Sequence, residues 1–490
     1  MFNPWERLQN LKIENRPFIN GQFVHTEKTL KKISPIDSIE LPPLYVCGEE
    51  EVNLAVKTAL KTYKNKIWRD KTAKEKKRIL LKLADLMEEN REELALLDTI
   101  ETGRSIKNFY YDSIPKAIEA LRWFAEAVDK YLDYAVTPEK NKMVSIVKMP
   151  LGVVGIITPW NDPLVVAFWK IAPALLMGNS VVIKPAEQST FSMLKVAELS
   201  IEAGIPEGVL NVITGEGETG KYLAMHNDVR GIFFTGSSEV GKKILQYAGM
   251  SNMKKVKLEC GGKSAFILTK NYKNLKRAAE VLAKNIFYNQ GQICSAPSRL
   301  IIDSKIKDEF LNLVVEESKK YIPSDPLSFE TEVGNLVSST QKERVEGYIK
   351  EGIYSGAKII SCDENIFKEM SIAPVILDNV PPDSPVAQEE IFGPVLVVIE
   401  YKDIKEAVEI ANSTKYGLAA SVWSDDINEA NYVAKELEAG LVHINTYGEE
   451  DNQVPFGGVK ESGIGRDKSI LAFDEYSEIK TIWTYLEDIQ

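Results

Sequence analysis

The sequence contains very little cysteine and histidine for its length. Its 490 residues include four cysteines and three histidines, all widely spaced. No C-x-x-C pair occurs, which excludes a zinc ribbon and a thioredoxin-like motif. Free thiols are typical of a reducing cytosol, so we expect a cytoplasmic location. With so few histidines we expect no histidine-rich metal site, and any catalytic base is expected to be a carboxylate.

Long apolar runs and an excess of positive charge are also missing. No run of about 18 apolar residues occurs, so no membrane span is expected, and the N-terminus lacks the apolar core of a signal peptide. The formal net charge is −11, which argues against a nucleic-acid partner because such a partner requires a basic surface. The length predicts roughly two to four domains.

Short apolar runs alternate with helical patterns along most of the chain. Strands are predicted within 142–161 and at 180–187, 209–215 and 229–236, with helices at 189–203, 217–225 and from residue 239. A second alternation places strands at 263–268, 298–303, 394–399, 420–424 and 441–445, with helices at 274–290, 306–320 and 403–412. This pattern predicts an α/β fold with two mostly parallel sheets, each covered by helices on both faces. Ligands are then expected at the carboxyl ends of strands.

Three segments lie outside these alternations. The spacing of apolar residues predicts one amphipathic helix over 74–100 and another over 104–130. The C-terminal segment 477–488 mixes apolar and polar residues as a strand does. Because it follows the last predicted core element, it is a candidate for pairing with another subunit.

Two strand ends carry residues suited to a nucleotide. In FFTGSSEVG (233–241) a strand leads into Gly236 and then a helix, whose N-terminus favours phosphate. The spacing is not G-x-G-x-x-G, and the same pattern is typical of an ordinary tight turn. In IKPAE (183–187), Lys184 and Glu187 could bind ribose, and a carboxylate there would favour NAD over NADP. The alternative is solvated charge after a strand.

Two further stretches carry residues suited to catalysis. Glu259 in KLECGGKSAF (257–266) lies beside apolar residues, and a partly dry site would raise its pKa and suit it to general-base work. The alternative is a strand-end carboxylate with backbone partners. Cys294 in NQGQICSAP (289–297) is a candidate nucleophile, because a thiolate attacks carbonyl carbon readily. The alternative is inert packing, but its neighbours Asn289, Gln290 and Gln292 do not suit a core position.

Taken together, nine stretches resemble the NAD(P)-dependent aldehyde dehydrogenase superfamily. They are TPWNDP (158–163), WKIAPALLMGN (169–179), VIKPAEQS (182–189), FTGSSEVG (234–241), LECGGKS (258–264), GQICSA (291–296), EIFGPV (390–395), NTYG (445–448) and PFGGVKESGIGR (455–466). They follow the order of the family's motifs and span nearly the whole chain. The resemblance implies oxidation of an aldehyde to a carboxylic acid, with NAD as cofactor and NADP as the alternative.

The resemblance also implies a role for each matching residue. Cys294 matches the nucleophile, Glu259 the general base, and Asn161 the side-chain amide of the oxyanion hole. The cofactor positions are Pro159, Trp160, Lys184, Glu187, Gly217, Gly236, Ser237, Glu390 and Phe392. The implied domains are a cofactor-binding domain (1–126 and 151–261), a catalytic domain (262–461) and oligomerisation strands (127–150 and 476–490). These strands imply a homodimer or homotetramer.

The chain departs from the family pattern in its substrate region. Asp162 stands where many members have Phe, and GEEDNQ (448–453), with Glu450, stands where many have an aromatic residue. The remaining aromatic wall consists of Trp169, Tyr288 and Phe456. Acids near the mouth would attract cations, which predicts an aminoaldehyde or other polar aldehyde. The alternative is that these acids face solvent and the enzyme takes a broad range of aliphatic or aromatic aldehydes.

Another departure is Cys260, which replaces the usual Leu beside the base. A hypothesis follows that Cys260 and Cys294 form an inactivating disulfide under oxidation. Rival functions are a CoA-acylating dehydrogenase, which would need no Glu259, and a thioesterase-like hydrolase using Cys294, which would need no cofactor motifs. A semialdehyde substrate is disfavoured by the acids, and an inactive structural protein would be expected to lack one of the three catalytic residues.

Overall fold

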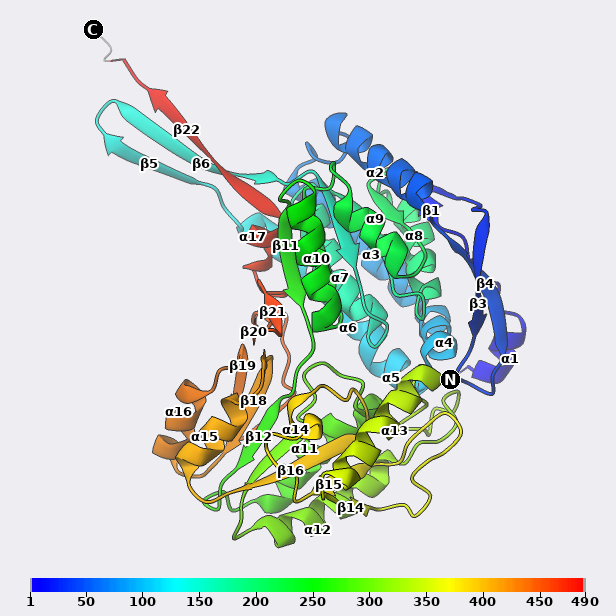
Figure 1. Ribbon diagram of the computed structural model, residues 1–490. Helices are drawn as coiled ribbons and strands as arrows, with labels where there is room; N and C mark the ends of the chain where they lie inside the picture. Colours follow the sequence, from blue (N-terminus) through cyan, green and yellow to red (C-terminus); the bar gives the residue numbers. More distant parts are fainter. Residues whose placement is uncertain (1, 488–490) are drawn as a thin grey trace.

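The first of two large sheets occupies the upper part of the molecule (Figure 1) in the computed structural model, which describes residues 2–487. Its order is β2 (Gln22–Phe23), β1 (Phe18–Ile19), β9 (Leu210–Val212), β8 (Ser180–Lys184), β7 (Val153–Ile157), β10 (Gly231–Thr235), β11 (Lys255–Glu259) and β21 (Gly463–Ile464). The five strands from β9 to β11 are parallel. They are rich in Val, Ile and Phe because both faces are buried.

Helices cover both faces of this sheet. One face packs on α3 (Ala73–Glu89), α4 (Arg91–Thr102), α6 (Ile114–Ala127), α7 (Pro163–Leu176) and α8 (Phe191–Ala203). The other packs on α2 (Glu49–Lys64), α9 (Gly217–Met225) and α10 (Ser238–Met250). Successive residues of a strand point to opposite faces. Thus Val154 and Ile156 of β7 join the first cluster, and Val153 and Ile157 join the second.

The second large sheet has the order β14 (Lys358–Ser361), β15 (Val375–Asp378), β16 (Val395–Tyr401), β13 (Arg299–Asp303), β12 (Ala265–Leu268), β18 (Ala419–Trp423) and β19 (Leu441–Ile444). It is parallel except for β14. One face carries α11 (Leu275–Phe287) and α12 (Lys307–Ser318), and the other carries α13 (Ser339–Tyr354), α14 (Pro385–Gln388), α15 (Ile404–Asn412) and α16 (Ile427–Glu436). The predicted α/β fold with two mostly parallel sheets is confirmed.

A third, antiparallel sheet extends away from the body of the molecule (Figure 1). It contains β5 (Tyr134–Glu139), β6 (Lys142–Pro150) and β22 (Ser477–Tyr485), with β6 in the centre. The predicted C-terminal strand is therefore present, but it pairs within its own chain. Its register with β6 runs from Ser477 opposite Pro150 to Tyr485 opposite Lys142. The outer edges of β5 and β22 have no strand paired to them among residues 2–487.

Shorter elements complete the chain. They are α1 (Pro4–Gln9), β3 (Lys28–Ile33), β4 (Glu40–Val46), α5 (Ile106–Asn108), η1 (Phe109–Ser113), η2 (Val128–Lys130), η3 (Tyr288–Gly291), η4 (Lys319–Tyr321), β17 (Tyr416–Gly417), β20 (Val459–Lys460) and α17 (Ala472–Glu475). No helix within residues 2–487 is long and apolar enough to cross a membrane.

One sequence-based expectation about the helices needs correction. The single helix predicted over 74–100 is two helices, because Asn90 leaves the helical conformation and its side chain donates to the carbonyl of Leu86. The chain also returns to the first sheet after the second, when Ile464 of β21 pairs with Leu258 of β11. The predicted boundary between the cofactor-binding and catalytic domains, at residues 261 and 262, lies between β11 and β12. The domain limits stay a prediction.

Candidate active site

A cavity of about 720 Å³ lies where the two large sheets meet. The loops after β7, β10 and β11 supply one side, and the loops before β13 and β16 supply the other. Fourteen of the residues singled out from the sequence line it: Pro159, Trp160, Asn161, Asp162, Trp169, Gly236, Ser237, Glu259, Tyr288, Cys294, Glu390, Phe392, Glu450 and Phe456. Three of the expected cofactor residues, Lys184, Glu187 and Gly217, lie outside its lining.

Cys294 is carried by a loop that begins where α11 ends. Asn289, Gln290 and Gly291 all have left-handed backbone, with φ of 48°, 54° and 67°. A side chain on Gly291 would lie 2.0 Å from the carbonyl oxygen of Gly393, so this position requires glycine. The loop is therefore bent sharply and packed closely against the chain that leads into β16.

The polar residues of this loop are buried, contrary to our expectation. Gln290 donates to the carbonyl of Gly334 at 2.6 Å and accepts from the amide of Ile372 at 3.0 Å. Gln292 accepts from the amide of Val337 at 3.1 Å. A buried polar side chain is stable when it is hydrogen-bonded. The buried side-chain amides of Gln290 and Gln292 therefore hold the loop against neighbouring segments of backbone.

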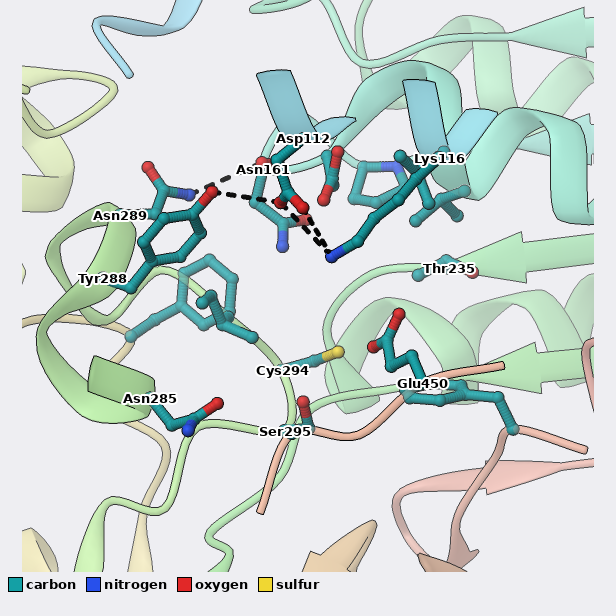
Figure 2. Close-up of a pocket in the computed structure, with 18 of the residues that line it drawn as sticks. Asp112, Lys116, Asn161, Thr235, Asn285, Tyr288, Asn289, Cys294, Ser295 and Glu450 are labelled. Carbon is teal, nitrogen blue, oxygen red and sulfur yellow. Dashed lines mark hydrogen bonds and ion pairs between the residues drawn. The ribbon is translucent and has the colours of Figure 1, made fainter. Parts of the chain in front are cut away.

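The surroundings of Cys294 favour its protonated thiol over the thiolate. Burial raises its pKa, and the nearby carboxylates of Glu390, Glu450 and Glu259 raise it further. Figure 2 shows Cys294 and Asn161 on opposite sides of the same space, with the amide nitrogen of Asn161 pointing toward it. A thiol here needs to lose its proton before or during attack on a carbonyl carbon.

Asn161 follows β7, and its amide is fixed in place. Its Nδ2 donates to the carbonyl of Gln292 at 3.1 Å, two residues before Cys294. The backbone carbonyl of Asn161 accepts from Arg104 at 3.2 Å and from Asn289 at 3.5 Å. One N–H of the amide is thus used to hold the loop of Cys294, and the other is available to an oxyanion in the cavity.

Glu259 ends β11 and is 3% exposed. Neither of its carboxylate oxygens has a hydrogen-bond partner within residues 2–487. Burial raises its pKa well above the ordinary value, and the charge of Asp467 raises it further. The absence of a side chain on Gly457 makes room for it, since a Cβ there would lie 2.5 Å from Oε1. Such a carboxyl, once ionised, is suited to accept a proton from water.

Behind Glu259 lies a buried group of three charges that the sequence did not reveal. Asp467 accepts hydrogen bonds from the ammonium groups of Lys170 and Lys257. All three side chains are at most 1% exposed. Burial alone would raise the pKa of Asp467, but the two ammonium groups hold it below its ordinary value. The net positive charge of this group favours the ionised form of Glu259, which offsets part of its burial.

The other end of the cavity has features suited to a nicotinamide nucleotide. Oε1 of Glu390 accepts from the amide of Gly262 at 3.0 Å, and burial raises the pKa of Glu390 to about 7. A side chain on Gly261 would lie 2.2 Å from that carboxylate. Trp160 and Phe392 meet edge to face at 5.3 Å between ring centroids. A partly buried carboxylate and an aromatic corner fit a ribose and a flat ring.

Gly236 and Ser237 lie at the N-terminus of α10, which opens on the cavity. Helix N-termini bind phosphate well. Further along the same edge of the sheet, Nζ of Lys184 lies 3.7 Å from the Glu187 carboxylate and donates to the carbonyl of Gly215. A side chain on Gly217 would meet open space. These residues can hold the distal half of a dinucleotide, outside the main cavity.

Three acids that line the cavity have basic partners, while Glu449 lines it as an exposed residue. Asp162 lies 3.4 Å from Arg104, and Glu450 lies 3.7 Å from Lys468. Asp112 lies 3.0 Å from Lys116 (Figure 2). The aromatic wall is present: Trp169 and Phe456 lie 5.1 Å apart, and Tyr288 lines the cavity beside them.

Cys260 also lines the cavity but packs differently from Cys294. Its sulfur faces α10, where a side chain on Gly241 would lie 2.9 Å from it. It belongs to the apolar cluster on the α10 side of the sheet, while Cys294 packs against the opposite cluster. Both are free thiols. This packing argues against a disulfide between Cys260 and Cys294.

No group of three or more His, Cys, Asp and Glu side chains in the described part of the chain could hold a metal ion.

Comparison with known proteins identifies close relatives. Residues 23–482 match the model of the aldehyde dehydrogenase family. The chain is 42% identical to the NADP/NAD-dependent aldehyde dehydrogenase PuuC of Escherichia coli, over 98% of each chain. It is 39% identical to the aminoacetaldehyde dehydrogenase of Pseudomonas aeruginosa, over 96% of each. A solved mutant of the P. syringae indole-3-acetaldehyde dehydrogenase AldA, in complex with NAD+ and IAA, superposes with a TM-score of 0.97 at 42% identity, over 99% of each chain.

Proposed function

The chain belongs to the aldehyde dehydrogenase family, and we propose that it uses Cys294, Glu259 and Asn161 to oxidise an aldehyde to a carboxylic acid. The observation that carries this proposal is their convergence on one cavity from three separate segments of the chain. Each supplies a function that the reaction requires: a nucleophile, a base and an oxyanion donor.

In the first step the Cys294 thiol gives its proton to water in the cavity, and the resulting thiolate attacks the aldehyde carbon. The new C–S bond leaves a tetrahedral oxyanion, which the free N–H of the Asn161 amide and the backbone N–H of Cys294 would stabilise. Such donors contribute roughly 3 to 4 kcal/mol each in comparable sites. They act because the loop of Cys294 and the amide of Asn161 are already fixed to each other.

Bound NAD would accept the hydride from this carbon, which converts the adduct to a thioester. Water then attacks the thioester carbon, Glu259 takes the proton, and the acid leaves as the C–S bond breaks. Glu259 suits this step because its oxygens lack partners and its pKa is raised. A CoA-acylating enzyme would not need this base, and a hydrolase would not need Glu390 and the α10 N-terminus facing the same cavity.

We propose NAD as the preferred cofactor. In this proposal Glu187 would accept from the ribose hydroxyls and would repel a 2′-phosphate. AldA is solved with NAD+, while the name of PuuC includes both nucleotides. Replacing Glu187 with Gln would be expected to raise kcat/KM for NADP about tenfold relative to NAD, measured with both cofactors at a fixed aldehyde concentration.

For the substrate we propose an aminoaldehyde or another polar aldehyde. The relative named for aminoacetaldehyde and the exposed acid Glu449 in the lining of the cavity support this class. A broad range of aliphatic and aromatic aldehydes is the second candidate, favoured by the aromatic wall of Trp169 and Phe456. Rates for 4-aminobutanal, succinic semialdehyde and benzaldehyde would decide between them.

The test of the reaction itself follows the absorbance of reduced nicotinamide with NAD, NADP or CoA present. We expect aldehyde-dependent reduction of NAD by the wild type and none by Cys294→Ala. If the wild type shows no aldehyde-dependent signal with any of the three, the proposed function is wrong.

We also propose that the β5–β6–β22 sheet joins subunits into a homodimer or homotetramer. Ile479, Trp483 and Tyr134 on this sheet are 71%, 64% and 61% exposed. Two open strand edges beside large apolar side chains are typical of a surface that pairs with another chain.

A further inference from the structure

Arg104 is a buried cation in the wall of the cavity that no sequence motif identified. It directly follows Gly103, whose left-handed backbone (φ 74°) ends α4. Its side chain is only 3% exposed to solvent, and it lines the cavity. The guanidinium carbon lies 4.9 Å from the ring centroid of Phe109 and 5.1 Å from that of Tyr288. The side chain is therefore held in one place by two rings.

The guanidinium joins two segments that carry site residues. It donates to the backbone carbonyl of Asn161 at 3.2 Å and to the hydroxyl of Tyr288 at 2.8 Å. It also lies 3.4 Å from the carboxylate of Asp162 and 3.9 Å from that of Asp112. The planar fork of arginine can make these contacts at once, whereas lysine cannot.

One consequence concerns Asn161. Its amide is useful as an oxyanion donor only if its backbone is held relative to Cys294. Arg104 supplies the shorter of the two hydrogen bonds to the Asn161 carbonyl, and Asn289 supplies the other at 3.5 Å. Loss of the guanidinium would leave that backbone held by one long contact.

The second consequence concerns Asp162. Its carboxylate is the acid nearest to Asn161 in the chain and lines the substrate side of the cavity. Arg104 is its only ion-pair partner within residues 2–487, and its Oδ1 atom is buried without a hydrogen-bond partner. With Arg104 present, the pair has no net charge. Without it, a negative charge would face the substrate.

We propose that Arg104 is a positioning residue for Asn161 and the internal counter-ion of Asp162, so that one guanidinium sets both the rate of aldehyde oxidation and the preference of the cavity between cationic and neutral aldehydes. This inference rests on the proposed function of Cys294 and Asn161. It deepens that function, because it names the group that determines how strongly the charge of Asp162 acts on the substrate.

The test uses the full-length enzyme and two aldehydes of the same shape, 3-aminopropanal and butanal. The variants are Arg104→Lys, Arg104→Met, Asp162→Asn and the double variant Arg104→Met/Asp162→Asn. Arg91→Met is the matched control, because Arg91 also lies over a tyrosine ring (5.0 Å, Tyr110) and forms an ion pair, with Glu88, but does not line the cavity. Thermal melting shows whether each variant folds.

We expect kcat for butanal to fall about tenfold in Arg104→Lys and Arg104→Met, less than the roughly 100-fold or greater cost of removing an oxyanion donor outright. KM for NAD should stay within about twofold of wild type, because the cofactor side is untouched. The ratio of kcat/KM for 3-aminopropanal over butanal should rise about tenfold in Arg104→Met, which leaves Asp162 without its cation, and fall about tenfold in Asp162→Asn, which removes the negative charge from the substrate wall. The double variant should restore the ratio but not kcat, and Arg91→Met should match wild type in both.

Wild-type kcat in Arg104→Lys would overturn the positioning role, and an unchanged ratio in Asp162→Asn would overturn the counter-ion role. Neither of these variants depends on Arg104→Met folding. If the wild type itself oxidises no aldehyde, the proposed function is wrong and the inference goes with it. If the wild type is active and every Arg104 and Asp162 variant resembles it, only the inference is wrong.

Discussion

The side-chain amide of Asn161 donates to the backbone carbonyl of Gln292 at 3.1 Å, which ties the end of β7 to the loop of Cys294. The two residues are 131 positions apart in the chain and belong to the two different halves of the site. The hydrogen bond means that the proposed nucleophile and the proposed oxyanion donor are held as one unit before any substrate arrives. Preorganised donors of this kind need no rearrangement during reaction.

Asn161→Ala should therefore lower kcat about 100- to 1,000-fold, because it removes a donor and releases the loop of Cys294. KM for NAD should change little, since Glu390 and the α10 N-terminus are unaffected. Steady-state kinetics with butanal and NAD would check this. The wild-type kcat in this variant would show that the amide does not contact the oxyanion.

Glu259→Gln should block the second half of the reaction and spare the first. Gln fills the same space but cannot take a proton from water, so the thioester on Cys294 should accumulate. We expect a burst of reduced nicotinamide of about one equivalent per active site, followed by slow turnover. Stopped-flow absorbance and the mass of the acid-quenched enzyme would measure it. A variant without a burst would place Glu259 before hydride transfer.

Much of this arrangement could be predicted from the sequence because it depends on strand ends. Glu259 ends β11 and Asn161 follows β7, and parallel strands bring their carboxyl ends to one edge. The predicted apolar runs located these strands to within a few residues. Nine motifs in order also identified the family to which the chain belongs.

The charges around the site could not be predicted in the same way. Arg104 and Tyr288 are 184 positions apart, and Lys170 and Asp467 are 297 apart. No local pattern indicates which distant acid a lysine or arginine will meet. For the same reason the sequence does not reveal the ion pair of Asp162 with Arg104. Nor does it reveal that Gln290 and Gln292 are buried, since their backbone partners lie in remote loops.

The β22 strand gives a prediction about assembly. Trp483→Glu places a charge on the exposed face of the three-stranded sheet, where a partner subunit would have to bury it. We expect the oligomer to dissociate toward monomers, as measured by size-exclusion chromatography with light scattering. Tyr354→Glu is the control, because Tyr354 is 89% exposed at the end of α13, away from this sheet. An unchanged mass for Trp483→Glu would rule out this sheet as the interface.

The pH dependence of turnover should report the charges behind Glu259. The carboxyl must be ionised to act as a base, and burial raises its pKa, so hydrolysis of the thioester should speed up as pH rises through that pKa. Lys257 lowers the pKa of Glu259 by its charge. Lys257→Met removes that charge, so the rising limb of the profile should move to higher pH.

Lys255→Met is the matched control for this shift. Lys255 lies on the same strand but is partly exposed and pairs at 3.5 Å with Glu475 rather than with Asp467. Its removal should leave the rising limb in place. The measurement is kcat against pH, under conditions where hydrolysis of the thioester limits the rate, as the Glu259→Gln variant shows. The burst phase is not used, because it reports Cys294 instead. If Lys257→Met moves the limb to lower pH, or leaves it where Lys255→Met does, the buried lysine does not act on the base.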